Sequence, residues 1–159
     1  MISVVIPAYN AGRFIRRTID SVLGQTCADY EIIVVDDGST DNTGEIVKSY
    51  GDKVRYIYQQ NAGDGPARNT GISAAKGEWI AFIDHDDQWL PEKLAKQIAL
   101  LESQPHLRWC ATAYYQTNSI QRTTIGSSAS IQKRLAGKMY IDNYFCNPAD
   151  FHVLTSTVM

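Results

Sequence analysis

The sequence has 159 residues, of which 44% are hydrophobic, and this length and composition suit one globular domain with an ordinary core. Its formal net charge is −2, which excludes a strongly basic surface, and we expect no nucleic-acid partner. No apolar run is long enough for a transmembrane segment and no signal peptide opens the chain, so we expect a cytoplasmic protein, either free or peripheral to the inner face of the membrane. The three cysteines, Cys27, Cys110 and Cys146, are widely spaced, which favours reduced thiols over disulfides or a zinc site.

Short apolar runs alternate with amphipathic stretches along the first two thirds of the chain. The apolar runs predict strands at residues 2–7, 31–35, 54–58, 79–83 and 108–115. Residues at helical spacing predict helices near 12–25, 41–50, 66–77 and from 91 past 101; in the first of them the recurring positions are Phe14, Ile15, Thr18, Ile19, Val22 and Leu23. This alternation predicts an α/β fold with a mostly parallel sheet and helices on both faces.

Particular residues mark where these helices begin and end. Pro66 and Pro91 suit the first position of a helix, and Gly77 suits the stop of the helix that begins at Pro66. Asp41 is predicted to cap the N-terminus of the second helix rather than to bind a ligand.

The chain changes character beyond residue 116. Residues 117–130 are rich in Ser and Thr and predict a loop or an exposed hairpin, residues 131–146 are loosely helical, and residues 151–159 resemble a strand that is cut off. We therefore expect a piece of a longer protein, with residues 1–115 as a ligand-binding half and residues 116–159 as the incomplete start of a second half.

Three carboxylates follow the predicted strand at 79–83, namely Asp84, Asp86 and Asp87. Clustered carboxylates repel one another unless a cation lies among them, and charged oxygens are the ligands that Mg²⁺ and Mn²⁺ prefer. A solvated acidic loop is the alternative interpretation of such a cluster.

Two further polar segments follow strands, at residues 8–10 and 36–39. The carboxyl ends of parallel strands meet at one edge of a sheet, where ligands bind, so we expect all three segments to converge. Tyr9 can pack beside a base, Asp37 can accept from an imide N–H such as that of uracil, and the acidic cluster can hold a cation beside a diphosphate. The sequence therefore predicts a site for a nucleotide diphosphate.

Four segments in order, residues 4–10, 34–41, 65–72 and 84–87, resemble the signatures of family 2 glycosyltransferases with the GT-A fold. The resemblance covers residues 2–110. It implies transfer of a sugar from a nucleotide-activated donor, commonly a UDP-sugar, to a saccharide or lipid-linked acceptor, with inversion and with Mn²⁺ or Mg²⁺ as cofactor. Polysaccharide biosynthesis is the corresponding process.

The resemblance also assigns residues. It implies that Ala8, Tyr9 and Asp37 hold the base, that Asp84 faces the ribose, and that Asp86 binds the metal, with Asp87 and Asp84 as competitors for that role. The full set of predicted nucleotide-binding residues is Pro7, Ala8, Tyr9, Asn10, Asp36, Asp37, Arg68, Asp84 and His85. Some have structural alternatives: Asp36 as a turn residue, Arg68 as the partner of a structural carboxylate, and His85 as a solvated side chain.

The chain departs from the family pattern in its catalytic base. The family's base is an acid in the acceptor-binding half, often in a Glu-Asp pair, and this chain contains no such pair. Asp142 and Asp150 are the only acids beyond Glu102, and neither lies in a matching motif. We therefore expect the base to lie beyond Met159, and the chain to bind donor nucleotide but transfer little or no sugar.

Other classes of protein fit less well. A nucleotide-sugar-binding module without catalysis is the main alternative. A receiver-like signalling domain needs acids after the first strand, where this chain has Pro7, Ala8, Tyr9 and Asn10, and a sugar-phosphate nucleotidyltransferase needs a glycine-rich basic loop there. Gly63 and Gly65 resemble part of a dinucleotide-binding motif, but Arg68 replaces its last glycine.

Overall fold

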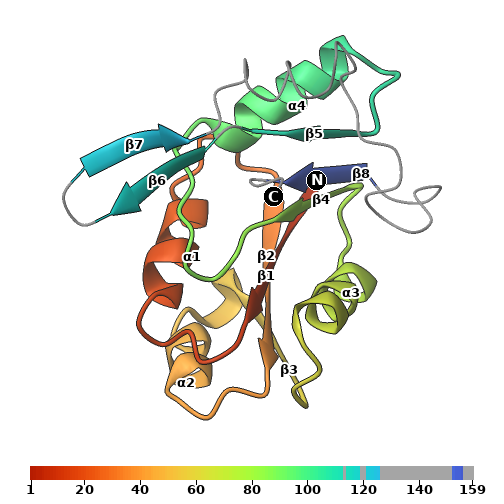
Figure 1. The fold of residues 1–159 in the computed structure, drawn as a ribbon. Coiled ribbons are helices and arrows are strands. Elements are labelled where there is room, and N and C mark those ends of the chain that lie inside the picture. The colour runs from red at the N-terminus through yellow and green to blue at the C-terminus, as the bar shows by residue number, and fades with distance from the viewer. Residues whose placement is uncertain (113, 119–120, 126–151, 156–159) are drawn as a thin grey trace.

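The fold is built on a six-stranded parallel sheet (Figure 1). The computed structural model describes residues 1–112, 114–118, 121–125 and 152–155. The strands of the sheet occur in the spatial order β3-β2-β1-β4-β8-β5, and every described pairing between them is parallel. Their bounds are β1 Ile2–Ala8, β2 Tyr30–Asp37, β3 Arg55–Gln59, β4 Trp79–Phe82, β5 Trp109–Ala111 and β8 His152–Thr155.

Helices cover both faces of the sheet. On one side α3 (Asp64–Ala74) packs on β1 and β2, and on the other side lie α1 (Ile15–Leu23) and α2 (Thr43–Lys48) (Figure 1). The helix α4 (Lys93–Ser103) belongs to the α1 side, because Leu94 and Leu101 share its apolar cluster, and a short 3₁₀ helix spans Gly51–Lys53. The predicted α/β architecture with a mostly parallel sheet is confirmed.

The central strand β1 is buried along its whole length, as expected for a strand covered on both faces. Because side chains alternate along a strand, Val4 and Ile6 pack toward α1 whereas Val5 packs with Ile80 and Phe82 on the α3 side. The helix α3 approaches this face so closely that a Cβ at Gly71 would lie 2.3 Å from Val5 Cγ1. An alanine at position 71 would therefore force Val5 or α3 to move.

Several predicted boundaries differ from the structure. The strand expected at 31–35 runs on through Asp36 and Asp37, because both residues continue the pairing with β1 or β3. Pro66 is the third residue of α3 rather than the first, a position that is tolerated because the first N–H groups of a helix have no intrahelical partner. Pro91 lies two residues before α4, and α3 ends at Ala74, before Gly77.

The predicted strand at 108–115 is wrong as a single element, since β5 ends at Ala111 and β6 begins at Tyr114. The strand β6 (Tyr114–Asn118) forms an antiparallel hairpin with β7 (Gln121–Ile125), which agrees with the hairpin expected in this region. The strand β8 confirms a strand within 151–159, and it pairs with both β4 and β5. The loosely helical segment at 131–146 lies outside the described residues. None of the helices in the described ranges has the length and apolarity needed to span a bilayer.

Candidate functional site

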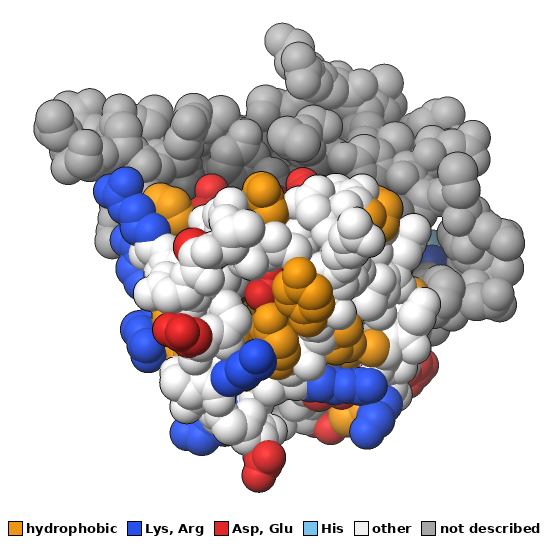
Figure 2. All heavy atoms as spheres, turned by 90° about the horizontal axis from the view of Figure 1, so that it is seen from below, with side chains coloured by type: hydrophobic (Ala, Val, Ile, Leu, Met, Phe, Trp, Pro, Cys, Tyr) orange, Lys and Arg blue, Asp and Glu red, His pale blue; other side chains and the backbone are white. Residues whose placement is uncertain are grey.

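The candidate site lies at the edge of the sheet where the strands end. There β1 ends at Ala8, β2 at Asp37, and β4 at Phe82, two residues before Asp84. Figure 2 looks toward this edge and shows hydrophobic side chains gathered in the middle of the face, with acidic side chains beside them and Lys and Arg side chains around them. The parallel register thus brings the three predicted segments to one edge, as expected.

The loop after β1 is tied to the loop after β2. The Asn10 N–H donates to Ser39 Oγ over 2.9 Å, and Asn10 Oδ1 accepts from the Thr40 N–H over 2.9 Å. Asn10 has a φ of 48°, a left-handed conformation that Asn adopts more readily than most residues. Asn10 therefore shapes the rim of the site by joining the two loops.

Asp41 lies in the same junction. Its carboxylate accepts from the Gly12 N–H and the Thr43 N–H, both over 2.9 Å, and it also contacts the Thr43 hydroxyl. Thr43 is the first residue of α2, so Asp41 satisfies a free N–H at the helix start from one position before the formal cap, Asn42. The expected structural role at the start of α2 is confirmed, but the N-cap position itself is occupied by Asn42.

Asp36 is buried and points toward α2. Its carboxylate accepts from the Tyr56 hydroxyl over 2.7 Å and from the Ser39 N–H over 2.9 Å. Burial, together with the hydrogen bond to Asp36, raises the pKa of Tyr56 well above its usual value. These contacts give Asp36 a structural role under the loop after β2.

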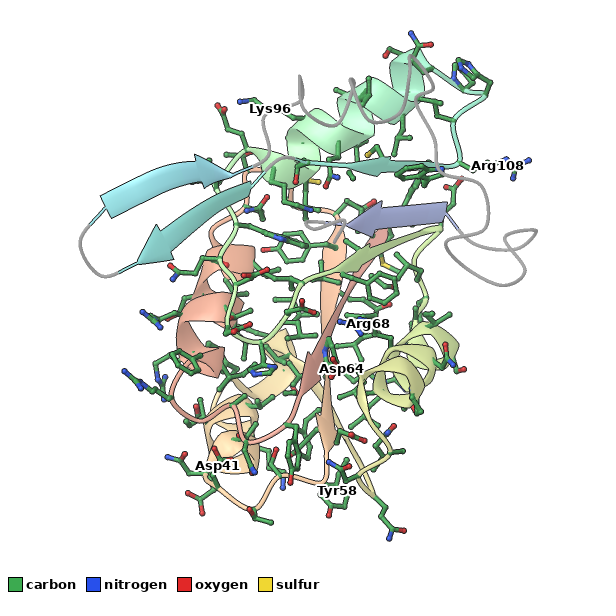
Figure 3. The ribbon with its side chains drawn as sticks, in the orientation of Figure 1. Asp41, Tyr58, Asp64, Arg68, Lys96 and Arg108 are labelled. Carbon is green, nitrogen blue, oxygen red and sulfur yellow. The ribbon has the colours of Figure 1, made fainter. Side chains whose placement is uncertain are left out.

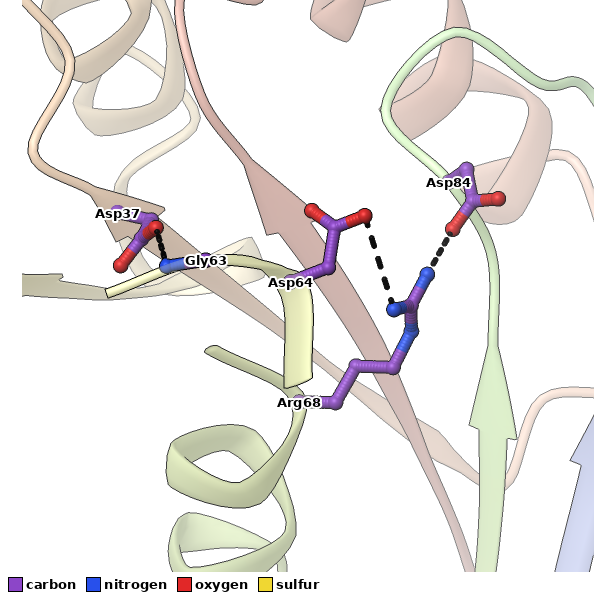
Figure 4. A network of polar contacts seen from close by, with 5 residues as sticks. All are labelled: Asp37, Gly63, Asp64, Arg68 and Asp84. Atoms are coloured by element: carbon purple, nitrogen blue, oxygen red, sulfur yellow. Dashed lines mark hydrogen bonds and ion pairs between the residues drawn. The ribbon is translucent and has the colours of Figure 1, made fainter. Parts of the chain in front are cut away.

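Asp37, the next residue, points to the opposite side, toward the loop before α3. Only 3% of it is exposed, and its carboxylate accepts from Gln59 Nε2 over 2.6 Å and from the N–H groups of Ala62 and Gly63, the latter over 2.7 Å (Figure 4). Desolvation acts to raise the pKa of Asp37, but these hydrogen bonds outweigh it and the pKa lies below its ordinary value. Asp37 is thus ionised and holds the loop at Gly63, which has a positive φ of 94°.

Arg68 links α3 to the loop after β4. Its Nη2 lies 2.7 Å from Asp84 Oδ1, and its Nη1 lies 3.8 Å from Asp64 Oδ2 (Figure 4). The guanidinium has five N–H donors, so these contacts leave donors for a further acceptor. The sequence left two roles open for Arg68, binding the nucleotide or pairing with a structural carboxylate, and the structure contains the pair with Asp84.

The remaining acidic residues lie in the same loop. Asp86 is exposed, while His85 and Asp87 are half-buried, and the Asp87 N–H donates to Asp84 O over 3.0 Å in a turn. Across the described ranges, no three His, Cys, Asp or Glu side chains group closely enough to enclose a metal ion by themselves. Mg²⁺ is usually held by one or two carboxylates together with substrate phosphates, and an exposed Asp86 fits that mode of binding.

Two tyrosines are exposed at the rim of the site. Tyr9 directly follows β1 and is 46% exposed, and Tyr58, near the end of β3, is 62% exposed. Figure 3 places Tyr58 and Asp41 at the edge where the strands end, with Arg68 and Asp64 nearer the centre and Lys96 and Arg108 far away, by α4 and β5. Pro7 and Ala8, the last two residues of β1, complete the predicted set and lie next to Tyr9.

Sequence reasoning missed some residues that build the site. Gln59 and Gly63 hold Asp37, and Thr18 contacts the main chain of the acidic loop. The turn-rich segment after β3 was the available signal for Gly63, whereas Thr18 was counted only as a member of the buried stripe of its helix.

Comparisons with known proteins agree on one family. The family model described as glycosyl transferase family 2 matches residues 3–154. An uncharacterized glycosyltransferase of Rickettsia typhi is 48% identical over 101 residues, which cover 64% of this chain and 32% of that protein. The glycosyltransferase GlyA of Streptococcus pneumoniae is 32% identical over 161 residues, covering 98% of this chain and 22% of that protein. The chain thus spans about a third or less of these relatives.

Solved structures show the same fold. Residues 1–349 of TarS from S. aureus in complex with UDP-GlcNAc match with a TM-score of 0.69 and 30% identity, over 80% of this chain and 37% of that one. The complex of the same protein with UDP matches with a TM-score of 0.70 and 28% identity. The predicted GT-A type of α/β fold is confirmed.

Proposed function

Because the chain belongs to glycosyl transferase family 2, we propose that it binds a UDP-sugar and serves transfer of the sugar, with inversion, to an acceptor hydroxyl. The observation that carries this proposal is the convergence of Tyr9, Asp37, Arg68 and Asp86 from four separate segments at one edge of the sheet. The TarS complexes with UDP and UDP-GlcNAc support UDP as the nucleotide. We take residues 1–115 as the donor-binding half and residues 116–159 as the start of the acceptor half.

The base and ribose lie, in this proposal, between the ends of β1 and β2. Tyr9 is exposed and offers a ring face, and Pro7 and Ala8 provide the apolar floor beside it. Asp37 is ionised, so it can accept the imide N–H of uracil, but its present donors Gln59 and Gly63 must then share its oxygens or shift. Asp36 and Asn10 contribute by shaping the loops, and Asp84 faces the ribose.

The diphosphate lies, in this proposal, beside α3 and the acidic loop. Arg68 provides positive charge there, with donors beyond the one used by Asp84. Mn²⁺ or Mg²⁺ held by Asp86, with Asp87 or Asp84 as a second ligand, would stabilise the negative charge on the departing diphosphate. His85 lies between Asp84 and Asp86, its carbonyl oxygen accepts from the Thr18 hydroxyl, and we propose it as a neighbour of the nucleotide.

Inversion at the anomeric carbon implies a single direct displacement. An acceptor hydroxyl oxygen forms a bond to C1 of the sugar as the bond from C1 to the diphosphate oxygen breaks, and the hydroxyl proton passes to a general base. The acceptor is a saccharide or lipid-linked hydroxyl of polysaccharide assembly, and this class is proposed by analogy with the family.

A second candidate function is binding of the nucleotide-sugar without catalysis. In the part of the chain that the structure describes, no Asp or Glu occurs beyond Glu102 to act as the base, and Asp142 and Asp150 lie outside that part. We propose that this chain by itself binds donor but transfers sugar slowly or not at all.

Calorimetry separates the two candidates from other nucleotide-binding functions. UDP, GDP and uridine are titrated into the protein with and without Mn²⁺, and UDP is then titrated into Asp86→Ala, Asp87→Ala and Asp84→Ala. We expect metal-dependent UDP binding that Asp86→Ala weakens most. Equal, metal-independent binding of UDP and GDP contradicts the proposal. Transfer from UDP-GlcNAc to an added acceptor by the 159-residue chain would refute the slow-transfer part alone.

A further inference from the structure

A stripe of three polar side chains on and after α1 faces the acidic loop. Thr18, Ser21 and Gln25 are three and four residues apart, so they project from one side of the helix. Thr18 and Gln25 are buried among the apolar residues of this face. Buried polar groups in proteins usually have hydrogen-bond partners, and all three side chains bond main-chain groups of residues 85–90.

Thr18 makes the contacts nearest the candidate metal ligand. Its hydroxyl lies 2.7 Å from the carbonyl oxygen of His85 and 2.8 Å from that of Asp87, so one proton is shared between two carbonyls. These two carbonyls flank Asp86. In a trans peptide the C=O and the following N–H point in opposite directions, so the same contacts direct the N–H groups of Asp86 and Gln88 away from α1.

The rest of the stripe continues this anchoring along the main chain. Ser21 Oγ accepts from the Trp89 N–H over 3.1 Å, and Gln25 Nε2 donates to Leu90 O over 2.8 Å. Gln25 Oε1 also accepts from the Leu94 N–H over 3.0 Å, in the first turn of α4. Two bonds return to the helix itself, from Ser21 Oγ to Thr18 O and from Gln25 Nε2 to Ser21 O. The other bonds of the stripe named here go to the backbone of residues 85–94, so they do not depend on which side chains the loop carries.

We propose that Thr18, supported by Ser21, is a positioning residue that fixes the direction of Asp86 and so sets the affinity of the site for the metal–diphosphate unit. This inference rests on the proposed function. It assigns Thr18 no contact with the donor itself, because its hydroxyl is used by the two carbonyls and it is fully buried. The base-binding end of the site, around Tyr9 and Asp37, lies on other segments and is independent of Thr18.

The test compares Thr18→Val, which removes the hydroxyl at nearly constant shape, with Thr18→Ser, which keeps it. We expect Thr18→Val to weaken the affinity of Mn²⁺ for the protein–UDP complex by about 10- to 100-fold, which is the usual effect of removing a hydrogen bond that orients a metal ligand. Thr18→Ser should retain the affinity, and uridine should bind all three proteins equally. Ser3→Ala is the matched control, because Ser3 is also buried and bonds main-chain groups, at Lys76 and Gly77, but lies at the other end of β1.

Unchanged Mn²⁺ affinity in folded Thr18→Val overturns the proposal, and so does an equal loss in Ser3→Ala. If Thr18→Val does not fold, Ser21→Ala takes its place, and unchanged Mn²⁺ affinity in that variant overturns the proposal. A second readout, amide hydrogen exchange of residues 85–90, needs no ligand. Exchange should accelerate about tenfold in Thr18→Val, or in Ser21→Ala where that variant replaces it, as expected for the loss of one hydrogen bond. It should not accelerate in Ser3→Ala. If the unaltered protein binds no UDP, the proposed function fails, and the exchange measurement still decides whether the stripe positions the loop.

Discussion

Replacing Arg68 with Met distinguishes a residue that binds the donor from one that only stabilises the fold. The Arg68 and Asp84 side chains are 28% and 46% exposed, so their 2.7 Å ion pair is screened by water. Exposed pairs contribute about 0–1 kcal/mol to stability, and we expect Arg68→Met to lower the free energy of unfolding by no more than that. A hydrogen bond from a guanidinium to a phosphate is worth more, about 1.5–3 kcal/mol. The affinity for UDP should therefore fall roughly 10- to 100-fold.

The assay pairs calorimetry with urea denaturation, and uridine serves as the ligand without phosphate. Its affinity should not change in Arg68→Met. Arg55→Met is the matched control, because Arg55 Nη1 also makes a 2.7 Å hydrogen bond, to Ala74 O, but Arg55 lies at the start of β3, away from the site. Unchanged UDP affinity in Arg68→Met, or a loss equal to that in Arg55→Met, would show that Arg68 is only a structural partner of Asp84.

Three further predictions concern stability. Gly71→Ala should lower the free energy of unfolding by about 1–3 kcal/mol, because the new Cβ meets Val5 Cγ1 at 2.3 Å. Gly65→Ala should not lower it, because a Cβ at Gly65 meets nothing within 4 Å. Equal effects of the two substitutions in urea denaturation would contradict the packing of α3. Burial lowers the pKa of Lys93 to about 7 in the folded protein. Between pH 7 and the ordinary pKa of lysine, Lys93 is therefore protonated in the unfolded state but not in the folded one, and the free energy of unfolding should rise with pH over this range. Lys93→Met should remove that rise in denaturation curves between pH 7 and 10, and an unchanged slope would refute the assignment. Asp37 has a pKa below its ordinary value, so its contribution to stability is present above the ordinary pKa and is lost as pH falls through the lowered one. Asp37→Asn should therefore lower the free energy of unfolding at pH 7 and flatten its dependence on pH in the acid range. An unaltered dependence in the acid range would contradict this role of Asp37.

The order and type of the strands and longer helices as far as α4 followed from local pattern. Parallel strands covered on both faces are apolar along their whole length, which is why β1 and β4 were evident from the sequence. The strand ends were less evident, because Asp36 and Asp37 have the composition of a turn while pairing with neighbouring strands extends β2 through both of them. Proline gave only approximate helix starts. Pro66 lies inside the first turn of α3, which accepts proline, whereas Pro91 precedes α4 by two residues.

The meeting of the three polar segments at one edge was predictable, but the contacts within them were not. The convergence of Asp37 and Asp86 at one edge follows from parallel topology, which the alternation of elements specifies. The contacts of Asp37 with Gln59 and Gly63 depend on the path of a loop that no periodicity describes. Thr18 shows a different limit, because its spacing is that of a core residue and only its partners in the loop reveal a polar role.

A crystal structure of the protein grown with UDP and Mn²⁺ tests the central claim most directly. We predict the uracil ring beside Tyr9 with its imide N–H on Asp37, and the diphosphate near Arg68 with the ion on Asp86. Nucleotide bound away from the ends of β1, β2 and β4, or an ion bound without Asp84, Asp86 or Asp87, would contradict the account.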